Sequence, residues 1–181
     1  MTSNVGKWSK QYRGVVEPLP YGDSNTYRMG AKQLADCPVV EDWGCGLGWF
    51  RQFLGPDQVY RGVDGTLSQF STVVADLTKF TSDTPGLFMR HVLEHDTQWD
   101  RILNNALSSF TKRMVLVIFT PFARAKPHKE LRFDKNYGVP TLGLNYDTLV
   151  AHFKSFTWTE HELESPETYY RRETVFVLER P

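Results

Sequence analysis

Three alternating glycines follow a short apolar run in this chain, and no other feature limits the possible folds as strongly. Residues 39–48 read V-V-E-D-W-G-C-G-L-G, so the run ends in an acidic residue before the glycines begin. Glycine allows tight turns and lets a ligand approach the backbone closely. A helix that follows such a turn presents unpaired N–H groups to an anion. The segment therefore predicts a buried strand and a turn that cradles a nucleotide-like ligand.

The spacing of these glycines differs from the spacing that dinucleotide-binding proteins use. Those proteins carry the pattern G-x-G-x-x-G, in which the third glycine permits close packing of a helix on a strand. Counted from Gly44 and Gly46, that third position holds Trp49. The bulky indole opposes this close packing, and a dinucleotide site is therefore disfavoured.

Short apolar runs bounded by Gly, Asp or Pro recur along the chain and alternate with segments long enough for helices. This alternation is typical of a parallel sheet with crossover helices. No helix fits between the last two runs, so we expect them to form an antiparallel hairpin. The predicted strands cover residues 39–42, 58–63, 73–75, 87–90, 114–119, 156–162 and 174–179, and the predicted helices cover residues 26–35, 49–54, 97–111 and 146–153.

The string D-x-G-x-G-x-G at residues 42–48 resembles motif I of the class I S-adenosylmethionine (SAM)-dependent methyltransferases. In that family an acid at the end of the second strand binds both ribose hydroxyls, and Asp64 matches this acid. A second acid, after the third strand, lies near the adenine amino group with an apolar residue against the ring. Asp76 and Leu77 match this pair. Residues 91–95, H-V-L-E-H, are similar to the segment after strand four in many of these enzymes.

The resemblance implies a Rossmann-like α/β sandwich with a mostly parallel seven-stranded sheet and an antiparallel last strand. It also implies SAM as cofactor, S-adenosylhomocysteine (SAH) as product and a small-molecule acceptor. Only eight residues separate Asp64 from Val73, which leaves the usual helix between strands two and three short or missing. The implied cofactor-binding residues are Tyr12, Asp42, Trp43, Gly44, Cys45, Gly46, Asp64, Gly65, Asp76, Leu77 and Arg90.

Two histidines are the candidate catalytic residues. Methyl transfer is an in-line displacement at an activated sulfonium, so the protein positions two reactants and, where needed, removes a proton. His91 and His95 are the candidate bases, because imidazole titrates near neutral pH. We expect both at the carboxyl end of strand four. The alternative is that His91 only packs against the cofactor and His95 only caps the next helix.

Two other functions fit parts of the sequence. A SAM- or nucleotide-binding module without catalysis needs the same glycines and acids. The segment H-x-x-E-H at residues 91–95 is also the zinc motif of inverted zincin peptidases, provided that it lies well inside a helix. The peptidase interpretation leaves the glycines and the acids unexplained, so a methyltransferase without a metal site is preferred.

The charge balance argues against a polyanionic partner. The chain has 21 Lys+Arg and 21 Asp+Glu, so it has no long-range field to gather phosphates, and nucleic acid is disfavoured. Its longest dense apolar run is too short to span a membrane. Two cysteines form no disulfide framework and the first residues lack a secretory pattern, so we expect a cytoplasmic protein. The oligomeric state and the acceptor stay open.

We expect a single domain over residues 1–181, with an N-terminal extension at 1–30 and an α/β core at 31–181. The extension is rich in aromatic residues and is interpreted as a lid over the cofactor, the alternative being packing on the sheet. Basic side chains between residues 124 and 135 are interpreted as a solvated loop rather than as an anion site. The aromatic residues concerned are Trp8, Tyr12, Tyr21 and Tyr27.

Overall fold

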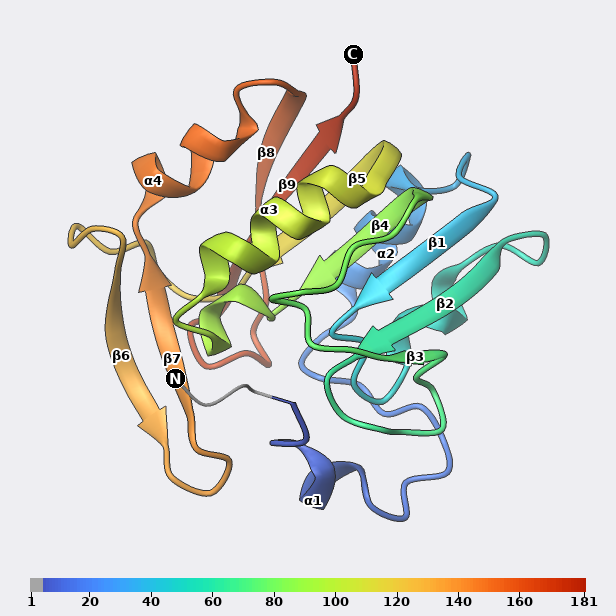
Figure 1. Cartoon of the computed structure of the whole chain (residues 1–181), viewed down its shortest axis with the longest axis horizontal. Coiled ribbons are helices and arrows are strands. Elements are labelled where there is room, and N and C mark those ends of the chain that lie inside the picture. The colour runs from blue at the N-terminus through green and yellow to red at the C-terminus, as the bar shows by residue number, and fades with distance from the viewer. Residues whose placement is uncertain (1–4) are drawn as a thin grey trace.

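The structure, a computed structural model, describes residues 5–181 and is built on a seven-stranded sheet (Figure 1). Its strands are β1 (Val39–Trp43), β2 (Val59–Asp64), β3 (Val73–Val74), β4 (Thr84–Arg90), β5 (Phe110–Ile118), β8 (Thr157–Glu164) and β9 (Arg172–Glu179). They are ordered β3-β2-β1-β4-β5-β9-β8. The first five strands in this order, from β3 through β2, β1 and β4 to β5, pair in parallel. Strand β9 is antiparallel to both β5 and β8. This confirms the predicted fold class, including the antiparallel last strand.

Helices cover both faces of the sheet, and strand β4 shows why. Helix α3 (Trp99–Ser109) lies on one face, and α2 (Asn25–Gln33) with the 3-10 helix η1 (Trp49–Phe53) lies on the other (Figure 1). Successive side chains of a strand point to opposite faces. Leu87 and Met89 therefore join the core under α3, while Phe88 stacks on Phe50 at 3.8 Å between ring centroids in the core under α2. The central strands are apolar on both faces because both faces are covered.

One pair of strands was not predicted. Strands β6 (His128–Asp134) and β7 (Val139–Leu144) form an antiparallel hairpin of their own, seen beside the main sheet at the left of Figure 1. The interpretation of residues 124–135 as a loop was wrong from His128 onward. The reason is that β6 is mostly exposed and charged, so it lacks the alternating apolar pattern, and its conformation depends on pairing with β7.

The predicted helices exist, with shorter or tighter geometry. Residues 49–54 form η1 rather than an α-helix, and residues 146–153 divide into α4 (Tyr146–Val150) and the 3-10 helix η3 (Ala151–Phe153). Helix α3 ends before residue 110, where β5 begins. Residues 65–72 contain turns and bends without a helix, as the short spacing predicted. Helix α2 runs across residue 30, the expected end of the N-terminal extension.

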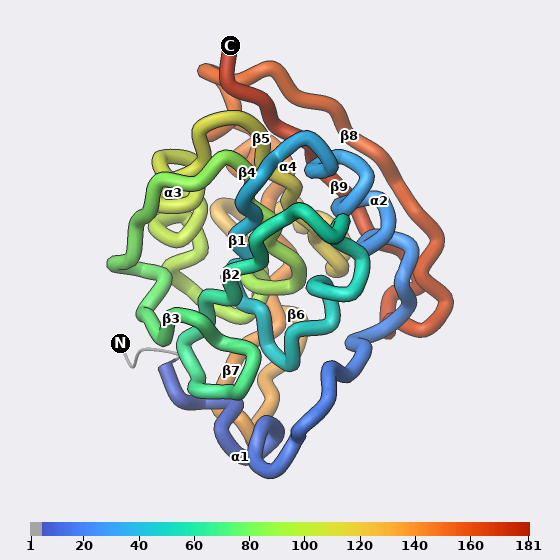
Figure 2. Tube along the Cα trace, turned by 90° about the vertical axis from the view of Figure 1, so that its right-hand side faces the viewer, coloured from blue at the N-terminus to red at the C-terminus, as the bar shows by residue number. Residues whose placement is uncertain are grey.

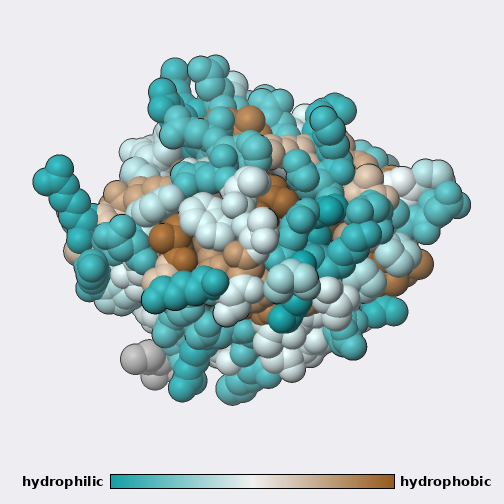
Figure 3. All heavy atoms as spheres, turned by 90° about the horizontal axis from the view of Figure 1, so that it is seen from above, coloured by the Kyte–Doolittle hydropathy of each residue, from teal (hydrophilic) through white to brown (hydrophobic). Residues whose placement is uncertain are grey.

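The N-terminal segment lies on the outside of this core. After the one-turn helix α1 (Ser9–Tyr12), it runs along the edge of the molecule up to α2 (Figure 2). Seen from above, hydrophobic side chains appear as small patches among hydrophilic ones (Figure 3). Within residues 5–181, no helix is long and apolar enough to cross a membrane.

Candidate functional site

A cavity of about 290 Å³ opens at the carboxyl ends of β1, β2 and β4. Open α/β sheets bind their ligands at this edge. The wall comes from residues 44–49, from the segments after β2 and β3, from residues 90–96 and from the N-terminal strap, which we define as residues 5–24. Of the predicted site residues, the structure brings together Tyr12, Gly44, Cys45, Gly46, Asp64, Gly65, Asp76, Leu77, Arg90, His91 and His95 in this wall.

The loop after β1 depends on glycine at its first position. Gly44 and Gly46 have φ angles of 75° and 51°, in the left-handed region. A Cβ on Gly44 would lie 2.3 Å from Cγ2 of Val92, so a side chain does not fit there. Above Gly46, the hydroxyl of Tyr12 lies 3.4 Å from where a Cβ would be. The loop is thus held between residue 92 and the strap.

The helix after this loop differs from the prediction. The sequence predicted a helix whose N–H groups face the ligand, but η1 is a 3-10 helix of five residues. Trp49, its first residue, lines the cavity, and its indole Nε1 is buried without a hydrogen-bond partner within residues 5–181. An indole N–H can only donate. Trp49 therefore offers a ligand one side-chain N–H donor, whereas the sequence predicted the backbone N–H groups at the start of a helix.

Asp64 presents a carboxylate at the end of β2. Its Oδ2 accepts the amide of Gly46 at 2.9 Å and its Oδ1 accepts the amide of Thr66 at 2.7 Å. Burial raises the pKa of Asp64 to about 6. The carboxylate is still ionised at neutral pH, and each oxygen keeps a second lone pair. Two hydroxyl groups on adjacent carbons can donate to such a carboxylate.

Asp76 and Leu77 place polar and apolar surface side by side after β3. Oδ1 of Asp76 accepts the amide and the hydroxyl of Thr78 at 3.0 and 2.7 Å. The backbone carbonyl of Leu77 accepts Nδ2 of Asn105 from α3 at 2.8 Å, which fixes this turn against the helix. Both residues line the cavity. The arrangement suits a flat ring that carries an amino group.

Asp42 and Trp43, which the sequence also assigned to the cofactor, do not line the cavity. Oδ2 of Asp42 accepts the hydroxyl of Tyr60 at 2.9 Å, and burial raises the pKa of Asp42 to about 7. The Trp43 side chain is fully buried in the core, and its Nε1 donates to Oε2 of Glu41 at 3.0 Å. The structure places both residues behind the glycine loop, where they support it.

The strap reaches across the cavity from the β2 side to the β6–β7 hairpin. The amide of Gly6 donates to the carbonyl of Gly65 at 2.8 Å. Two residues further on, Trp8 stacks on Tyr137 at the hairpin end, with ring centroids 4.6 Å apart. Trp8 also meets the edge of His95 at 5.6 Å. The aromatic side chains predicted to form a lid thus all line the cavity, although Tyr27 does so from α2 and is also packed in the core.

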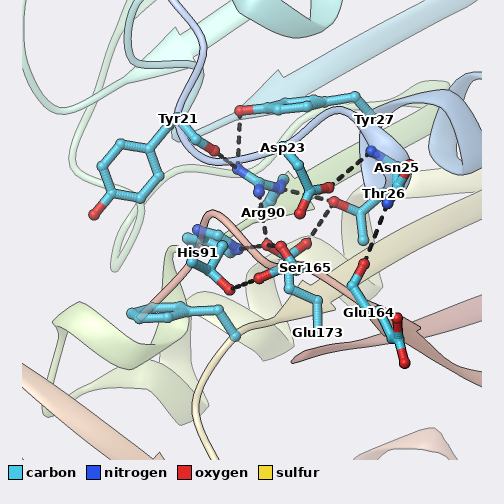
Figure 4. Close-up of polar contacts among 12 residues, drawn as sticks. Tyr21, Asp23, Asn25, Thr26, Tyr27, Arg90, His91, Glu164, Ser165 and Glu173 are labelled. Carbon is cyan, nitrogen blue, oxygen red and sulfur yellow. Dashed lines mark hydrogen bonds and ion pairs between the residues drawn. The ribbon is translucent and has the colours of Figure 1, made fainter. Parts of the chain in front are cut away.

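Arg90 joins the strap to the sheet (Figure 4). Its Nη1 donates to the carbonyl of Tyr21 at 2.6 Å and to the hydroxyl of Tyr27 at 2.9 Å, and its Nε donates to Oγ1 of Thr26 at 2.9 Å. Its Nη2 forms an ion pair with Oε1 of Glu173 at 2.7 Å. The side chain is only 3% exposed, and these four bonds use four of its five N–H donors. Arg90 lines the cavity chiefly as a support.

The two histidines differ in their partners. Nε2 of His91 lies 3.0 Å from Oε1 of Glu173, and its Nδ1 is buried without a partner within the described chain. Burial, helped by the neighbouring Arg90, lowers the pKa of His91 to about 4, so the ring is neutral at pH 7. Nδ1 of His95 lies 3.0 Å from the carbonyl of Pro140 in β7, and burial lowers the pKa of His95 as well.

The sequence reasoning missed two carboxyl groups near these histidines. Glu173 at the start of β9 is fully buried, and the only signal was a lone acid entering an apolar run. Glu94 is also fully buried, and its Oε1 accepts the amide of Phe119 at 2.7 Å. Burial raises the pKa of Glu94 to about 8. In the sequence Glu94 stands out only as part of the H-x-x-E-H segment, and nothing there indicates that it is buried.

The zinc-peptidase alternative required residues 91–95 to lie well inside a helix. They do not: His91 follows β4 with a φ of 57°, and only Leu93–His95 form a 3-10 helix, η2. The two imidazoles therefore do not lie one turn apart on a helix face, and Nε2 of His91 faces Glu173. The geometry disagrees with the peptidase motif.

Comparisons with known proteins place the fold. No known family profile matches the chain, and no curated protein matches it. Among solved structures, the chain is similar to a 1,6-didemethyltoxoflavin-N1-methyltransferase from Burkholderia thailandensis with bound SAH (TM-score 0.63, 15% identity, 87% of this chain and 79% of that one). It is also similar to the magnesium protoporphyrin IX methyltransferase of Synechocystis with bound SAM (0.61, 14%, 87% and 79%). A third is the N-methyltransferase NodS of Bradyrhizobium japonicum (0.59, 11%, 86% and 94%).

These likenesses cover most of each chain at low sequence identity, and they agree with the observed strand order and the antiparallel last strand. The chain therefore has the fold of the class I SAM-dependent methyltransferases.

Proposed function

We propose that this protein binds SAM in the cavity and transfers its methyl group to a small-molecule acceptor. One observation carries the proposal: the cavity gathers the glycine loop, the Asp64 carboxylate and the Asp76–Leu77 pair at the edge where this fold binds its ligands. These groups come from the ends of three neighbouring strands. Their chemistry matches a ribose, an adenine and a ligand that needs close approach to the backbone.

The residues present fit the cofactor. Asp64 would accept hydrogen bonds from the two ribose hydroxyls, Asp76 would accept one from the adenine amino group, and Leu77 would pack against the ring. Trp49 Nε1, buried and unpartnered within the described residues, is a further donor for an anionic end. Bound SAM supplies a methyl group on a sulfonium that is already activated for transfer.

His91 is the proposed proton acceptor. Burial lowers the pKa of His91 to about 4, so its imidazole is neutral at physiological pH and has one nitrogen lone pair that can receive a proton. The ionised Glu173 at 3.0 Å stabilises the imidazolium that then forms. His95 also lines the cavity and is the second candidate.

The strap encloses the transfer. Trp8 and Tyr12 cover the cavity from the outside, and an enclosed site keeps water from competing with the acceptor. The small size of the cavity favours a small acceptor over a macromolecule. Two of the neighbours described above, the toxoflavin and the protoporphyrin methyltransferases, are named for small-molecule substrates, which agrees with this size.

Calorimetry tests the cofactor assignment directly. Wild-type protein should bind SAM and SAH, with NAD as the negative control. Asp64→Ala should weaken both by about 1.5–3 kcal/mol, or about 10- to 150-fold, because the ribose hydroxyls lose a charged acceptor. The matched control is Asp57→Ala, which removes an exposed carboxylate in the loop before β2 and should leave affinity unchanged.

Thermal unfolding of both variants checks that each is folded at the titration temperature. Unchanged SAM affinity in a folded Asp64→Ala variant would contradict the assignment. Binding of SAM without turnover on a panel of small hydroxyl, amine and carboxylate acceptors would favour a binding module over an enzyme.

A further inference from the structure

We propose that Glu173 is a positioning residue that holds His91 in one tautomer, with the proton on Nε2 and the free lone pair on Nδ1. This inference rests on the proposed function, because the lone pair is useful only if His91 accepts a proton. Glu173 lies on β9, far from His91 in sequence, and does not line the cavity. It therefore acts through His91 and not on a ligand.

The carboxylate of Glu173 is surrounded by donors (Figure 4). Oε1 accepts Nη2 of Arg90 at 2.7 Å and Oγ of Ser165 at 3.0 Å, and Oε2 accepts the hydroxyl of Thr26. The side chain is fully buried, and although burial alone raises its pKa, the hydrogen bond from His91 and the charge of Arg90 outweigh burial and lower the pKa to about 2. An ionised carboxylate has acceptors only. The 3.0 Å contact with His91 Nε2 thus requires that Nε2 carries the proton.

The other nitrogen of His91 then follows from the chemistry of imidazole. A neutral ring with a proton on Nε2 has an acceptor at Nδ1. That atom is buried, has no hydrogen-bond partner within residues 5–181, and belongs to a side chain that lines the cavity. A buried polar atom without a partner is unfavourable unless a ligand completes it. Nδ1 of His91 is therefore a free hydrogen-bond acceptor in the cavity wall, available to the proton that a bound substrate loses when it is methylated.

The backbone at His91 points the same way. Its φ of 57° lies in a region that non-glycine residues rarely adopt, and such strain is maintained only where surrounding contacts impose it. Two contacts impose it here. The His91 ring is held by Glu173, and the His91 backbone N–H donates a hydrogen bond to the carbonyl of Val117 at 3.2 Å. A buried ion pair with Arg90 alone would not need His91 in this conformation. The carboxylate serves the histidine as well as the arginine.

Nuclear magnetic resonance of ¹⁵N-histidine-labelled protein tests the tautomer without any ligand. We expect one ring proton downfield of the backbone amides, coupled to Nε2 of His91, as for an imidazole N–H bonded to a buried carboxylate. The signal should be absent in His91→Gln, which assigns it. An Nδ1-protonated His91 in the wild-type protein would overturn the proposal.

Two variants test the role of Glu173. In Glu173→Gln the resonance should move upfield, because a neutral amide is the weaker acceptor; an unmoved resonance in the folded variant contradicts the proposal. Should that variant fail to fold, Ser165→Ala removes a different donor from Oε1 and leaves His91 in place. The His91 bond should then strengthen and its proton move further downfield, and an unmoved signal would again contradict the proposal.

The two proposals fail separately. Loss of SAM binding in calorimetry removes the proposed function but leaves the Nε2–H signal unchanged. A wrong tautomer removes the positioning role but leaves SAM affinity unchanged.

Discussion

The two halves of the cavity are built in different ways. On one side, the glycine loop, Asp64 and Asp76 each lie at or just after the end of a strand, and their contacts are mostly with residues in the same loop or the next one. On the other side, His91 and Arg90 depend on Glu173 and on the strap, which are tens of residues away in the sequence. We name these the cofactor half and the base half.

This difference predicts which substitutions affect only one loop and which affect the overall stability. In the cofactor half, a substitution should alter one loop and ligand affinity. In the base half, a single carboxylate and a single guanidinium connect β4, β9, α2 and the strap, so a substitution should be felt in the stability of the whole domain. Four predictions test this difference between the cofactor half and the base half.

The largest effect is expected in the base half from Arg90→Met. It leaves the Glu173 carboxylate buried without its main counter-charge, which typically costs about 3–5 kcal/mol. The matched variant is Arg172→Met, which breaks the exposed Arg172–Glu162 pair and should cost about 0–1 kcal/mol. Urea unfolding of both proteins measures the difference. Equal costs would mean that the buried pair does not hold the base half together.

In the cofactor half, Gly44→Ala should destabilise the glycine loop, although it adds only one methyl group. The new Cβ meets Val92 at 2.3 Å in addition to the unfavourable φ of 75°. The control is Gly14→Ala, which has the same φ but nothing within 4 Å of the new atom. The free energy of unfolding should fall by about 1–3 kcal/mol more for Gly44→Ala than for the control. A difference near zero would show that the loop can move away from residue 92.

Glu94→Gln should change the pH dependence of stability. The pKa of Glu94 is about 8 in the folded protein and near the ordinary 4.5 when unfolded, so between these values the folded state binds more protons. Wild-type stability that is present below pH 4.5 is therefore lost as pH rises towards 8, and the neutral glutamine variant does not share this loss.

The measurement is the unfolding free energy of wild type minus that of Glu94→Gln, followed from pH 4.5 to 8.5. It should fall steadily and then level off above pH 8. The exposed Glu167→Gln serves as control and should give a flat difference. A flat difference for Glu94→Gln too would mean that this carboxyl is not buried as the structure shows.

The smallest effect is expected from Tyr137→Ala, which removes the ring under Trp8. Stacked aromatic pairs contribute about 0.5–1.5 kcal/mol, so global stability should barely change. Hydrogen exchange of the Gly6 amide, which is bonded to Gly65, should become several-fold faster because the strap is held less firmly. Unchanged exchange would show that the hairpin does not hold the strap.

The contrast also explains what could be predicted from the sequence. The seven strands, the glycine loop, Asp64 and Asp76 were found because each signal lies within about ten residues of the feature it specifies. The missing helix between β2 and β3 followed from a simple residue count. Where an apolar pattern or a strand end specifies the structure, the sequence is sufficient.

The rest depended on tertiary contacts that leave no local pattern. Asp42 reads like a cavity residue because it precedes the glycines, yet only the fold shows that it pairs with Tyr60 behind the loop. Strand β6 is charged and exposed, so its pairing with β7 was not visible. The contact of Glu173 with His91 could not be predicted, because it depends on β9 pairing with β5, which brings Glu173 close to the end of β4.

The position of β9 in the sheet has a consequence for synthesis on the ribosome. In the sheet of the described residues β8 is an edge strand that pairs with β9, and β9 is the last of these strands in chain order. Until β9 leaves the exit tunnel, Arg90 and His91 lack Glu173, and β8 has no neighbour in the sheet to pair with. Nascent chains that stop before residue 173 therefore carry the glycine loop and both cavity acids but an uncompensated arginine, and the base half is the part of the domain completed last.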